Sequence, residues 1–305
     1  MRLKNFLIAF AMVSFSIGFT SCKKDNNTNS SPDAATEAKT QADDQAFFSN
    51  ETDLATNDAN ASLDASGGSY NETPAGINTP LLSLPCDATI TVDTTSNPHT
   101  ITITYSGNNC NLTRSRTGSV VVSFAPGFKW GDEGAQLTLK FEKLKITRNI
   151  DGKSIIINGT RTVTNVKGGL LKNLATLDSI EHKIDDTNMS VTFDNGAQRT
   201  WETHFTRVFT YSNGIVISTT GSVNGKNRFN DDFSSSILQP LVVEQSCDFR
   251  LVSGSAMHTG AKVNTTVTFG LDINGNAVSG CPLLFYLNVV FTGPNGNSLS
   301  YILPY

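Results

Sequence analysis

The chain has little charge, few cysteines and no apolar run of membrane-spanning length. Only 16% of its 305 residues are charged and five are cysteines. The longest apolar run, residues 6–19, falls short of the roughly 20 residues that a transmembrane helix needs. Coiled coils, collagen and helical membrane bundles are therefore excluded. The remaining composition, with 24 Gly among many Thr, Ser and Asn, predicts a β-rich protein of one large or two small domains.

The common signatures of catalysis and metal binding are also missing. There is no nucleophile elbow, Walker loop, Gly-x-Gly-x-x-Gly, His-Glu-x-x-His or Cys-x-x-Cys, so no cofactor or metal is expected. Residues 75–305 hold 18 basic and 17 acidic side chains, whereas residues 22–74 hold three basic and ten acidic ones. A nearly neutral body offers no basic face for phosphate backbones, which predicts that nucleic acid is not a partner.

The N-terminus carries the most specific signal in the sequence. Arg2 and Lys4 precede the apolar run, which ends in Thr20-Ser21-Cys22. This order predicts a signal peptide over residues 1–21. Small residues before a cysteine favour lipoprotein processing, in which Cys22 becomes the new N-terminus and carries acyl chains such as palmitate. The alternative is an ordinary secretory signal cleaved near Ser21.

The sequence Phe19-Thr20-Ser21-Cys22, followed by Lys-Lys-Asp, resembles the lipoproteins that Bacteroidota carry on their outer membrane. In that group, inner-membrane retention goes mainly with Asp directly after the cysteine, and Lys23 occupies that position here. The resemblance therefore implies an outer-membrane location. Display on the cell surface goes with a more acidic stretch than Asp25 provides. The resemblance therefore allows either orientation, towards the cell surface or towards the periplasm.

Residues 22–75 form a predicted acidic tether. Its first part is rich in Asp, Asn, Thr and Ser, which cannot bury apolar area. From about residue 35 to 63, Ala and Glu or Gln become common, and apolar side chains approach helical spacing. A short amphipathic helix within a disordered tether is one interpretation. Disorder throughout is the other, because Asn and Asp recur in this stretch.

The body, residues 76–305, alternates apolar and polar side chains with the period of half-buried strands. The alternation slips after Phe141, which predicts a β-bulge near Glu142 and Lys143. Tight turns are predicted at five pairs, Asp151-Gly152, Asn195-Gly196, Asn213-Gly214, Asn224-Gly225 and Asn274-Gly275. The prediction is an all-β antiparallel meander of about a dozen strands, forming either a sandwich or a rolled, partly open barrel.

Four cysteines remain in the body, and an oxidising compartment would pair them. A hairpin turning at Asn97-Pro98 would place Cys86 near Cys110, which leaves Cys247 for Cys281, although other connectivities stay open. Similar segments follow Cys86 and Cys247, so one interpretation divides the body into two halves, about 86–212 and 213–305, each closed by a disulfide. The alternative is that the alternation of Thr with apolar residues recurs by chance. The arrangement also resembles uncharacterised Bacteroidota lipoproteins with paired cysteine hairpins, a resemblance that implies no activity.

Acidic clusters are the remaining candidates for chemistry. They are Asp132-Glu133, Glu181 with Asp185-Asp186, and Asp231-Asp232. Glycoside hydrolysis needs two carboxyl groups about 5 to 10 Å apart. A glycan-directed hydrolase is therefore the alternative function, although acids in polar turns are usually only solvated. The sequence Asp272-x-Asn274-x-Asn276 imitates a calcium loop but lacks its final Glu, and is interpreted as a hairpin turn.

Aromatic residues offer the last candidate contacts. Trp201, Phe205, Phe209 and Tyr211 share one strand parity, which favours a core over a sugar-stacking row. Trp130, in a turn-like Gly-rich segment, is the candidate for a ligand contact. The sequence thus predicts a non-enzymatic, lipid-anchored protein of the outer membrane, bound to the membrane by its lipid and presented to a glycan or an envelope protein.

Overall fold

The computed structural model describes residues 34–65, 85–110, 112–247, 249–261, 264–293 and 296–305. The predicted signal peptide, Cys22 and the tether outside residues 34–65 lie outside these ranges. Within them, thirteen strands form one antiparallel sheet in which every strand pairs with the next one in sequence. The strands are β1 (Ala88–Asp93), β2 (His99–Asn108), β3 (Arg114–Phe124), β4 (Ala135–Arg148), β5 (Ser154–Asn165), β6 (Ile180–Phe193), β7 (Gln198–Tyr211), β8 (Ile215–Lys226), β9 (Asp232–Glu244), β10 (Arg250–Thr259), β11 (Asn264–Leu271), β12 (Tyr286–Thr292) and β13 (Ser298–Pro304).

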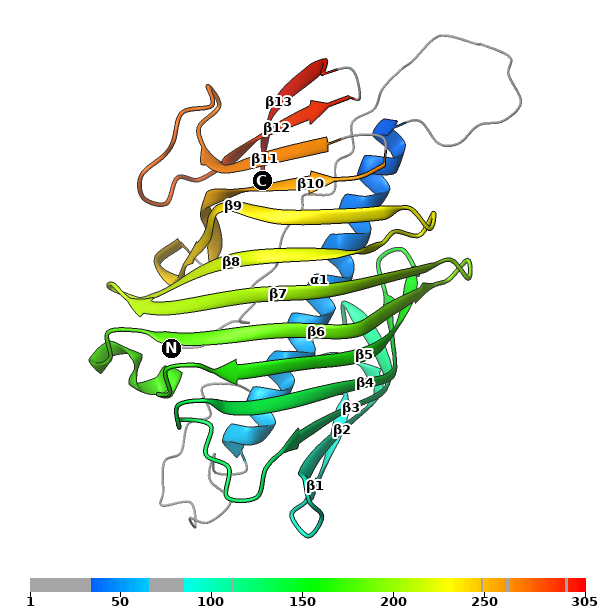
Figure 1. Cartoon of the computed structure of the whole chain (residues 1–305), viewed down its shortest axis with the longest axis vertical. Coiled ribbons are helices and arrows are strands. Elements are labelled where there is room, and N and C mark those ends of the chain that lie inside the picture. The colour runs from blue at the N-terminus through cyan, green and yellow to red at the C-terminus, as the bar shows by residue number, and fades with distance from the viewer. Residues whose placement is uncertain (1–33, 66–84, 111, 248, 262–263, 294–295) are drawn as a thin grey trace.

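The predicted antiparallel all-β meander is confirmed. Because all strands belong to one sheet, with β1 and β13 at opposite ends of the strand order, the open rolled form is present and not the sandwich. The sheet curls around helix α1 (Ala34–Ala65), which crosses behind the strands in Figure 1. The suggested boundary between two halves falls in the turn between β7 and β8. These strands pair from Thr200 to Tyr211, so the sheet continues across the boundary.

Helix α1 confirms the helical interpretation of the acidic segment, and it is longer than the short helix expected. It is only weakly amphipathic because its buried side has small and polar side chains among the apolar ones. Ala55 and Ala59 are almost fully buried and let the helix approach the sheet closely. The buried Thr52 hydroxyl bonds to the Phe48 carbonyl one turn earlier at 3.0 Å, which satisfies it within the helix. None of the helices in the described ranges is long and apolar enough to cross a membrane.

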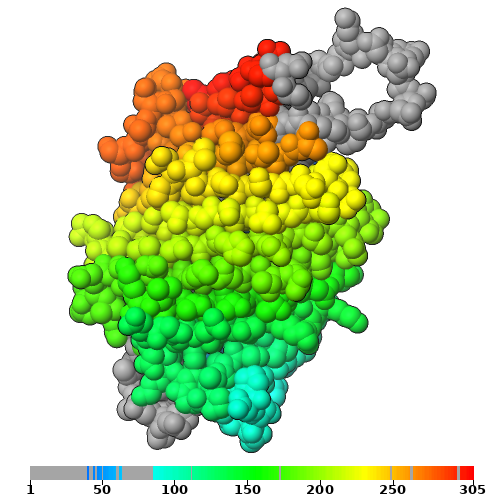
Figure 2. Space-filling model, in the orientation of Figure 1, coloured from blue at the N-terminus to red at the C-terminus, as the bar shows by residue number. Residues whose placement is uncertain are grey.

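We call the sheet surface that packs on α1 the inner face. Apolar residues at register partners line it strand after strand, as in the fully buried row Ile101, Val122 and Leu139. A second apolar cluster lies under β6 to β13 and is covered in part by Leu174 of the 3-10 helix η1 (Leu171–Thr176). The opposite, outer face forms a continuous surface that hides α1 in the space-filling view (Figure 2). The body is therefore a single curved layer with its core on one side.

Bulges bend the sheet at matching positions in β3 to β6. The predicted bulge is confirmed, since the β4–β5 register shifts between Phe141 and Leu144 and Lys143 has a φ of 51°. Gly118 of β3 lies opposite it, and a Cβ there would approach the Lys143 carbonyl oxygen to 2.3 Å. Bulges of this kind bend strands and increase twist. The same pairing of glycine and bulge recurs between Gly159 and Asn188, so the bend continues across neighbouring strands.

Four of the five predicted Gly turns are present between strands, and one prediction is wrong. Gly225 lies inside β8, where its register partners are Trp201 on β7 and Phe233 on β9. Both of these aromatic side chains are buried on the inner face. A Cβ at Gly225 would lie 2.0 Å from the Thr200 carbonyl oxygen, so the close approach of the β7 backbone requires glycine here. The turn after β8 uses Asn227, whose side-chain oxygen accepts the backbone N–H of Asp231 at 3.0 Å.

Both predicted cysteine pairs are present. Cys86 and Cys110 are bonded across the β1–β2 hairpin with their Cα atoms 5.6 Å apart. Cys247 and Cys281 are bonded with a Cα separation of 5.2 Å, joining the start of β10 to the loop before β12. Each bridge therefore closes a loop near one end of the strand order.

The bulge geometry predicts that Gly118→Ala destabilises the sheet far more than Gly152→Ala. Both glycines have positive φ, so both substitutions cost about 1 kcal/mol of backbone strain. Only the Gly118 Cβ meets a backbone atom, which adds about 2 kcal/mol of overpacking. Urea unfolding followed by circular dichroism measures both variants. Equal losses of stability in the two variants would contradict this prediction. They would show that the backbone adjusts to the new Cβ near Lys143 without a further loss of free energy of unfolding.

Candidate binding site between helix α1 and the inner face

Arginines interrupt the apolar inner face wherever α1 lies across it. Arg161, for example, follows the buried Ile155 and Ile157 on β5, and its side chain is only 5% exposed. The arginines that contact α1 through a carboxylate or an aromatic ring are Arg114, Arg116, Arg148, Arg161, Arg199, Arg207 and Arg228. The inner face thus combines positive charge with apolar surface.

The helix provides the matching negative charge at regular spacing. Asp44, Glu51 and Asp58 are seven residues apart, which places them on one side of α1 at intervals of two turns. The ion pairs along the helix are Asp44 with Arg228, Glu51 with Arg114 at 2.5 Å, Asp53 with Arg161 at 3.0 Å and Arg207 at 2.9 Å, and Asp58 with Arg116 at 2.7 Å. Helix and sheet are therefore held together by a charged interface that spans β3 to the β8–β9 turn.

Two of the arginines are held from both sides. Arg161 donates to Asp186 of β6 through Nε at 2.7 Å and Nη2 at 2.9 Å, and turns Nη1 to Asp53. Arg116 makes the same two-bond contact with Asp87, at 2.7 and 2.6 Å. Such paired hydrogen bonds fix the plane of the guanidinium group. The sheet thus presents these two cations to the helix in one orientation.

Burial sets the protonation of this interface. Desolvation raises the pKa of Glu51 and of Asp58, while Arg114 and Arg116 act in the opposite direction. Burial alone would lower the pKa of Arg116, but its hydrogen bonds to Asp87 and the charge of Asp58 raise it above the ordinary value. The Tyr105 hydroxyl donates to Asp58 at 2.8 Å. Arg116 therefore stays charged, and its charge is balanced by the carboxylates that it contacts.

An aromatic contact lies at the middle of the interface. The Phe48 ring lies 3.9 Å from the Trp201 ring, measured between centroids. The Arg199 guanidinium lies over both Phe48, at 4.9 Å, and Phe233, at 4.2 Å. Burial lowers the pKa of Arg199 to about 9. The prediction that the Trp201 row belongs to the core is consistent with these contacts, although Tyr211 at its end is 52% exposed.

The acidic clusters do not assemble a pair of carboxylates. Glu181, Asp185 and Asp186 lie within β6 and not in the loop that the sequence suggested. Asp186 points to the inner face and Arg161, whereas Asp185 points to the outer face and bonds to His204 at 2.8 Å. The separation by faces follows from the two-residue period of a strand. The two neighbouring acids therefore cannot act on one substrate.

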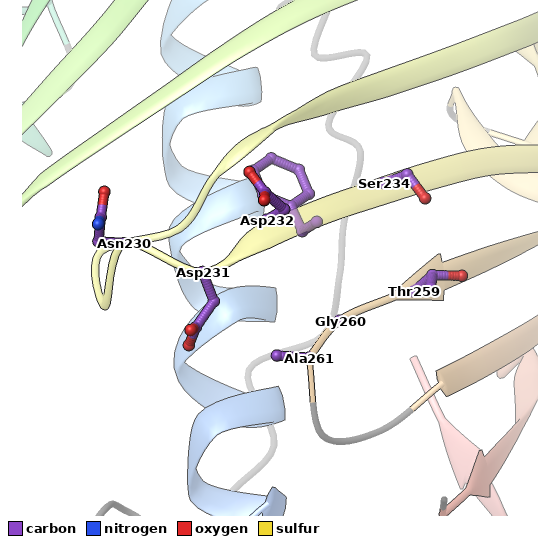
Figure 3. Close-up of a pocket in the computed structure, with 8 residues that line it drawn as sticks. Asn230, Asp231, Asp232, Ser234, Thr259, Gly260 and Ala261 are labelled. Atoms are coloured by element: carbon purple, nitrogen blue, oxygen red, sulfur yellow. The ribbon is translucent and has the colours of Figure 1, made fainter.

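The other two acidic clusters lie in or beside turns. Asp132-Glu133 occupy the turn between β3 and β4. Asp231 and Asp232 line an open pocket of about 500 Å³ between the β8–β9 turn and the end of β10 (Figure 3). Asp232 pairs there with Lys226 at 2.9 Å and its side chain is 86% exposed. These carboxylates are solvated, as expected for acids in turns.

The calcium-like sequence forms a turn. The Asp272 carboxylate accepts the backbone N–H groups of Asn274, at 2.8 Å, and Asn276, at 2.9 Å. The Asp272 carboxylate oxygens therefore accept hydrogen bonds within the turn. Among the described residues, no three His, Cys, Asp or Glu side chains come together as a metal site would require.

Trp130, the predicted ligand contact, is half-buried against the core. Its ring centroid lies 5.1 Å from that of His182, which in turn lies 5.0 Å from Phe209. Burial, together with the charge of Arg207, lowers the pKa of His182 to about 4. A neutral histidine thus fills the space between two aromatic rings, and only part of the Trp130 surface is open to a ligand.

The sequence interpretation missed the arginine interface, although two signals for it were present. Arg207 has the same strand parity as Phe205 and Phe209, which places a charge among core residues. On the helix, the seven-residue spacing of Asp44, Glu51 and Asp58 marks one acidic side. Each signal is ambiguous by itself, and only the complementarity of the two identifies an interface.

The chain matches no family model, no curated protein and no solved structure.

The double contact of Asp53 predicts that Asp53→Asn lowers the free energy of unfolding by about 3 to 5 kcal/mol. The substitution leaves two largely buried arginines without their shared anion, and breaking a buried ion pair in this way is strongly destabilising. Asp232→Asn is the matched control, because its ion pair with Lys226 is exposed and contributes little. Urea titrations of both variants provide the measurement. An Asp53→Asn protein as stable as the control would contradict the role assigned to the interface.

The buried His182 predicts a loss of stability in acid. The unfolded histidine takes up a proton near pH 6.5 and the folded one only near pH 4, so the free energy of unfolding falls as the pH drops through this window. The contribution is about 3 kcal/mol. His182→Phe, which keeps a ring between its neighbours, should reduce the slope in this pH range. Part of the slope should remain, because burial also lowers the pKa of His258 to about 4. An equally steep slope in His182→Phe would exclude His182 as its source.

Proposed function

We propose that the chain is a lipid-anchored outer-membrane protein with a non-enzymatic binding or structural role at the cell envelope. The acyl chains are attached to Cys22, and the body is presented to a glycan or an envelope protein. The observation that carries the proposal is the sequence before and after Cys22, with a signal-like apolar run before it and Lys23-Lys24 after it. The separation of Asp185 from Asp186 on two faces gives the hydrolase alternative no support.

The outer face of the sheet is the surface that we assign to the partner. Apart from Val208, the side chains that alternate along β7 with the buried row are polar, namely Gln198, Thr200, Glu202, His204, Thr206 and Thr210. Hydroxyl groups and exposed charges bind glycans and protein surfaces through hydrogen bonds. The inner face is already occupied by α1. A binding role for the outer face, which Figure 2 shows, is therefore favoured over one for the core side.

The anchor predicts that Cys22→Ala moves the protein from the membrane to the soluble fraction while the body stays folded. The acyl chains at Cys22 are the proposed membrane anchor, so their loss removes the strong attachment of the protein to the membrane. Ser21→Ala, which keeps a small residue before the cysteine, should remain attached. Fractionation followed by washing and immunodetection gives the result. A Cys22→Ala protein that withstands the wash would refute the anchor, and proteinase digestion of intact against lysed cells then distinguishes the surface from the periplasmic face.

A further inference from the structure

The end of the sheet at β12 and β13 carries no charged side chain. Asp272 is the last charged residue, and none of the 33 residues from 273 to 305 is Asp, Glu, Lys or Arg. Edge strands of soluble proteins usually carry charges, which oppose unwanted association. β13 forms the edge of the sheet here and contains only Ser, Leu, Tyr, Ile and Pro. This edge is therefore suited to contact with an uncharged surface.

Large apolar side chains are exposed in the same part of the chain, on both faces of β13 and in the loop before β12. Five of them are exposed and form what we call the C-terminal apolar edge, namely Ile273 at 66%, Leu283 at 94%, Leu284 at 52%, Leu299 at 64% and Ile302 at 39%. The loop after β11 belongs to this edge because the Ile302 Cδ1 atom lies 3.0 Å from the position that a Cβ at Gly275 would occupy. Exposed apolar groups concentrated in one region usually mark an interaction site.

Helix α1 begins at this end of the molecule. Its contacts run from Asp44 at the β8–β9 turn to Asp58 at β3, so the N-terminal part of the helix lies on the side of the late strands. The ten residues before Asp44 add about 15 Å in the same direction, which equals about three strand spacings. Figure 1 shows the Ala34 end of α1 at the level of β10 and β11. An anchor that precedes α1 is therefore attached on the side of the apolar edge.

The connection between anchor and helix is short. Eleven residues separate Cys22 from Ala34, and they can span at most about 40 Å. Resting on the proposed lipid anchor, we propose that the C-terminal apolar edge lies on the surface of the phospholipid bilayer and inserts its leucine and isoleucine side chains at the boundary between head groups and acyl chains. The edge has no charged side chain of its own, and the neighbouring Arg250 donates to the carbonyl oxygens of Pro282, at 2.9 Å, and Leu283, at 3.3 Å. This composition fits a zwitterionic lipid surface and not an electrostatic attraction to anionic lipid.

A second copy of the chain fits this surface less well. Pairing of β13 with β13 would use a strand of seven residues, about 23 Å long, and would leave Leu283 and Ile273 in loops outside the paired edge. A bilayer surface can take up side chains from strand and loops together. The arrangement thus favours lipid, and association of two copies is one outcome that the test must detect.

The test uses the chain from residue 22 onwards with Cys22→Ala, so that neither an acyl chain nor the apolar run of residues 6–19 contributes, and vesicles of pure phosphatidylcholine. We expect weak, reversible co-flotation with the vesicles that is unchanged between 0.1 and 0.5 M NaCl. Leu299→Ser with Ile302→Ser should lower the partition coefficient about tenfold, because both apolar contacts are lost. Ile150→Ser is the matched control, since Ile150 is 93% exposed in the β4–β5 turn. Its partition coefficient should equal that of the parent.

Three results would overturn the proposal. The first is the absence of flotation of the parent, and the second is an equal partition coefficient for the parent and the double variant. The third is a dimer, seen in sedimentation, that Leu299→Ser dissociates, because such a dimer would assign the edge to a second copy. Circular dichroism of each variant confirms that it is folded. Because the vesicle test does not involve acylation, its failure leaves the release of Cys22→Ala from cells as an independent measure of the anchor.

Discussion

Neutralisation of buried arginine is the constraint on which the rest of the structure depends. Guanidinium groups such as Arg161 and Arg116 cannot lie on an apolar inner face without anions, because removing an ion from water costs several kcal/mol. The sheet provides part of the negative charge through Asp186 and Asp87, and α1 provides the remainder. The helix is therefore as much a part of the core as any strand, although its own sequence is polar.

The same constraint fixes where the helix lies along the sheet. A shift of α1 by one turn would move every carboxylate by about 5.4 Å and break all of its ion pairs together. Ala55 and Ala59 would tolerate such a shift, since small side chains do not specify a register. Charge thus determines the position, and the bulges opposite Gly118 and Gly159 give the sheet the bend with which it follows the helix.

Local pattern was enough to predict the strands, most of the turns, the bulge at Lys143 and both disulfides, because each of these is set by neighbours or by a single hairpin. The choice between one sheet and a sandwich was not predictable in this way, since it depends on how many consecutive hairpins stay in one layer. The helix was ambiguous because its partners are remote in sequence. Asp44 meets Arg228 across 184 residues and Asp53 meets Arg207 across 154, and periodicity cannot show such pairs.

The order of residues along the chain has a consequence for folding. The meander consists of contacts between sequence neighbours, so its hairpins can form in turn with little loop-closure entropy. Helix α1 is synthesised before any strand, yet its last ion pair needs Arg228. The segment that is synthesised first must therefore wait, as an isolated polar helix or coil, until about two thirds of the body has followed it. Its docking is then the step that converts a series of local hairpins into one cooperative unit.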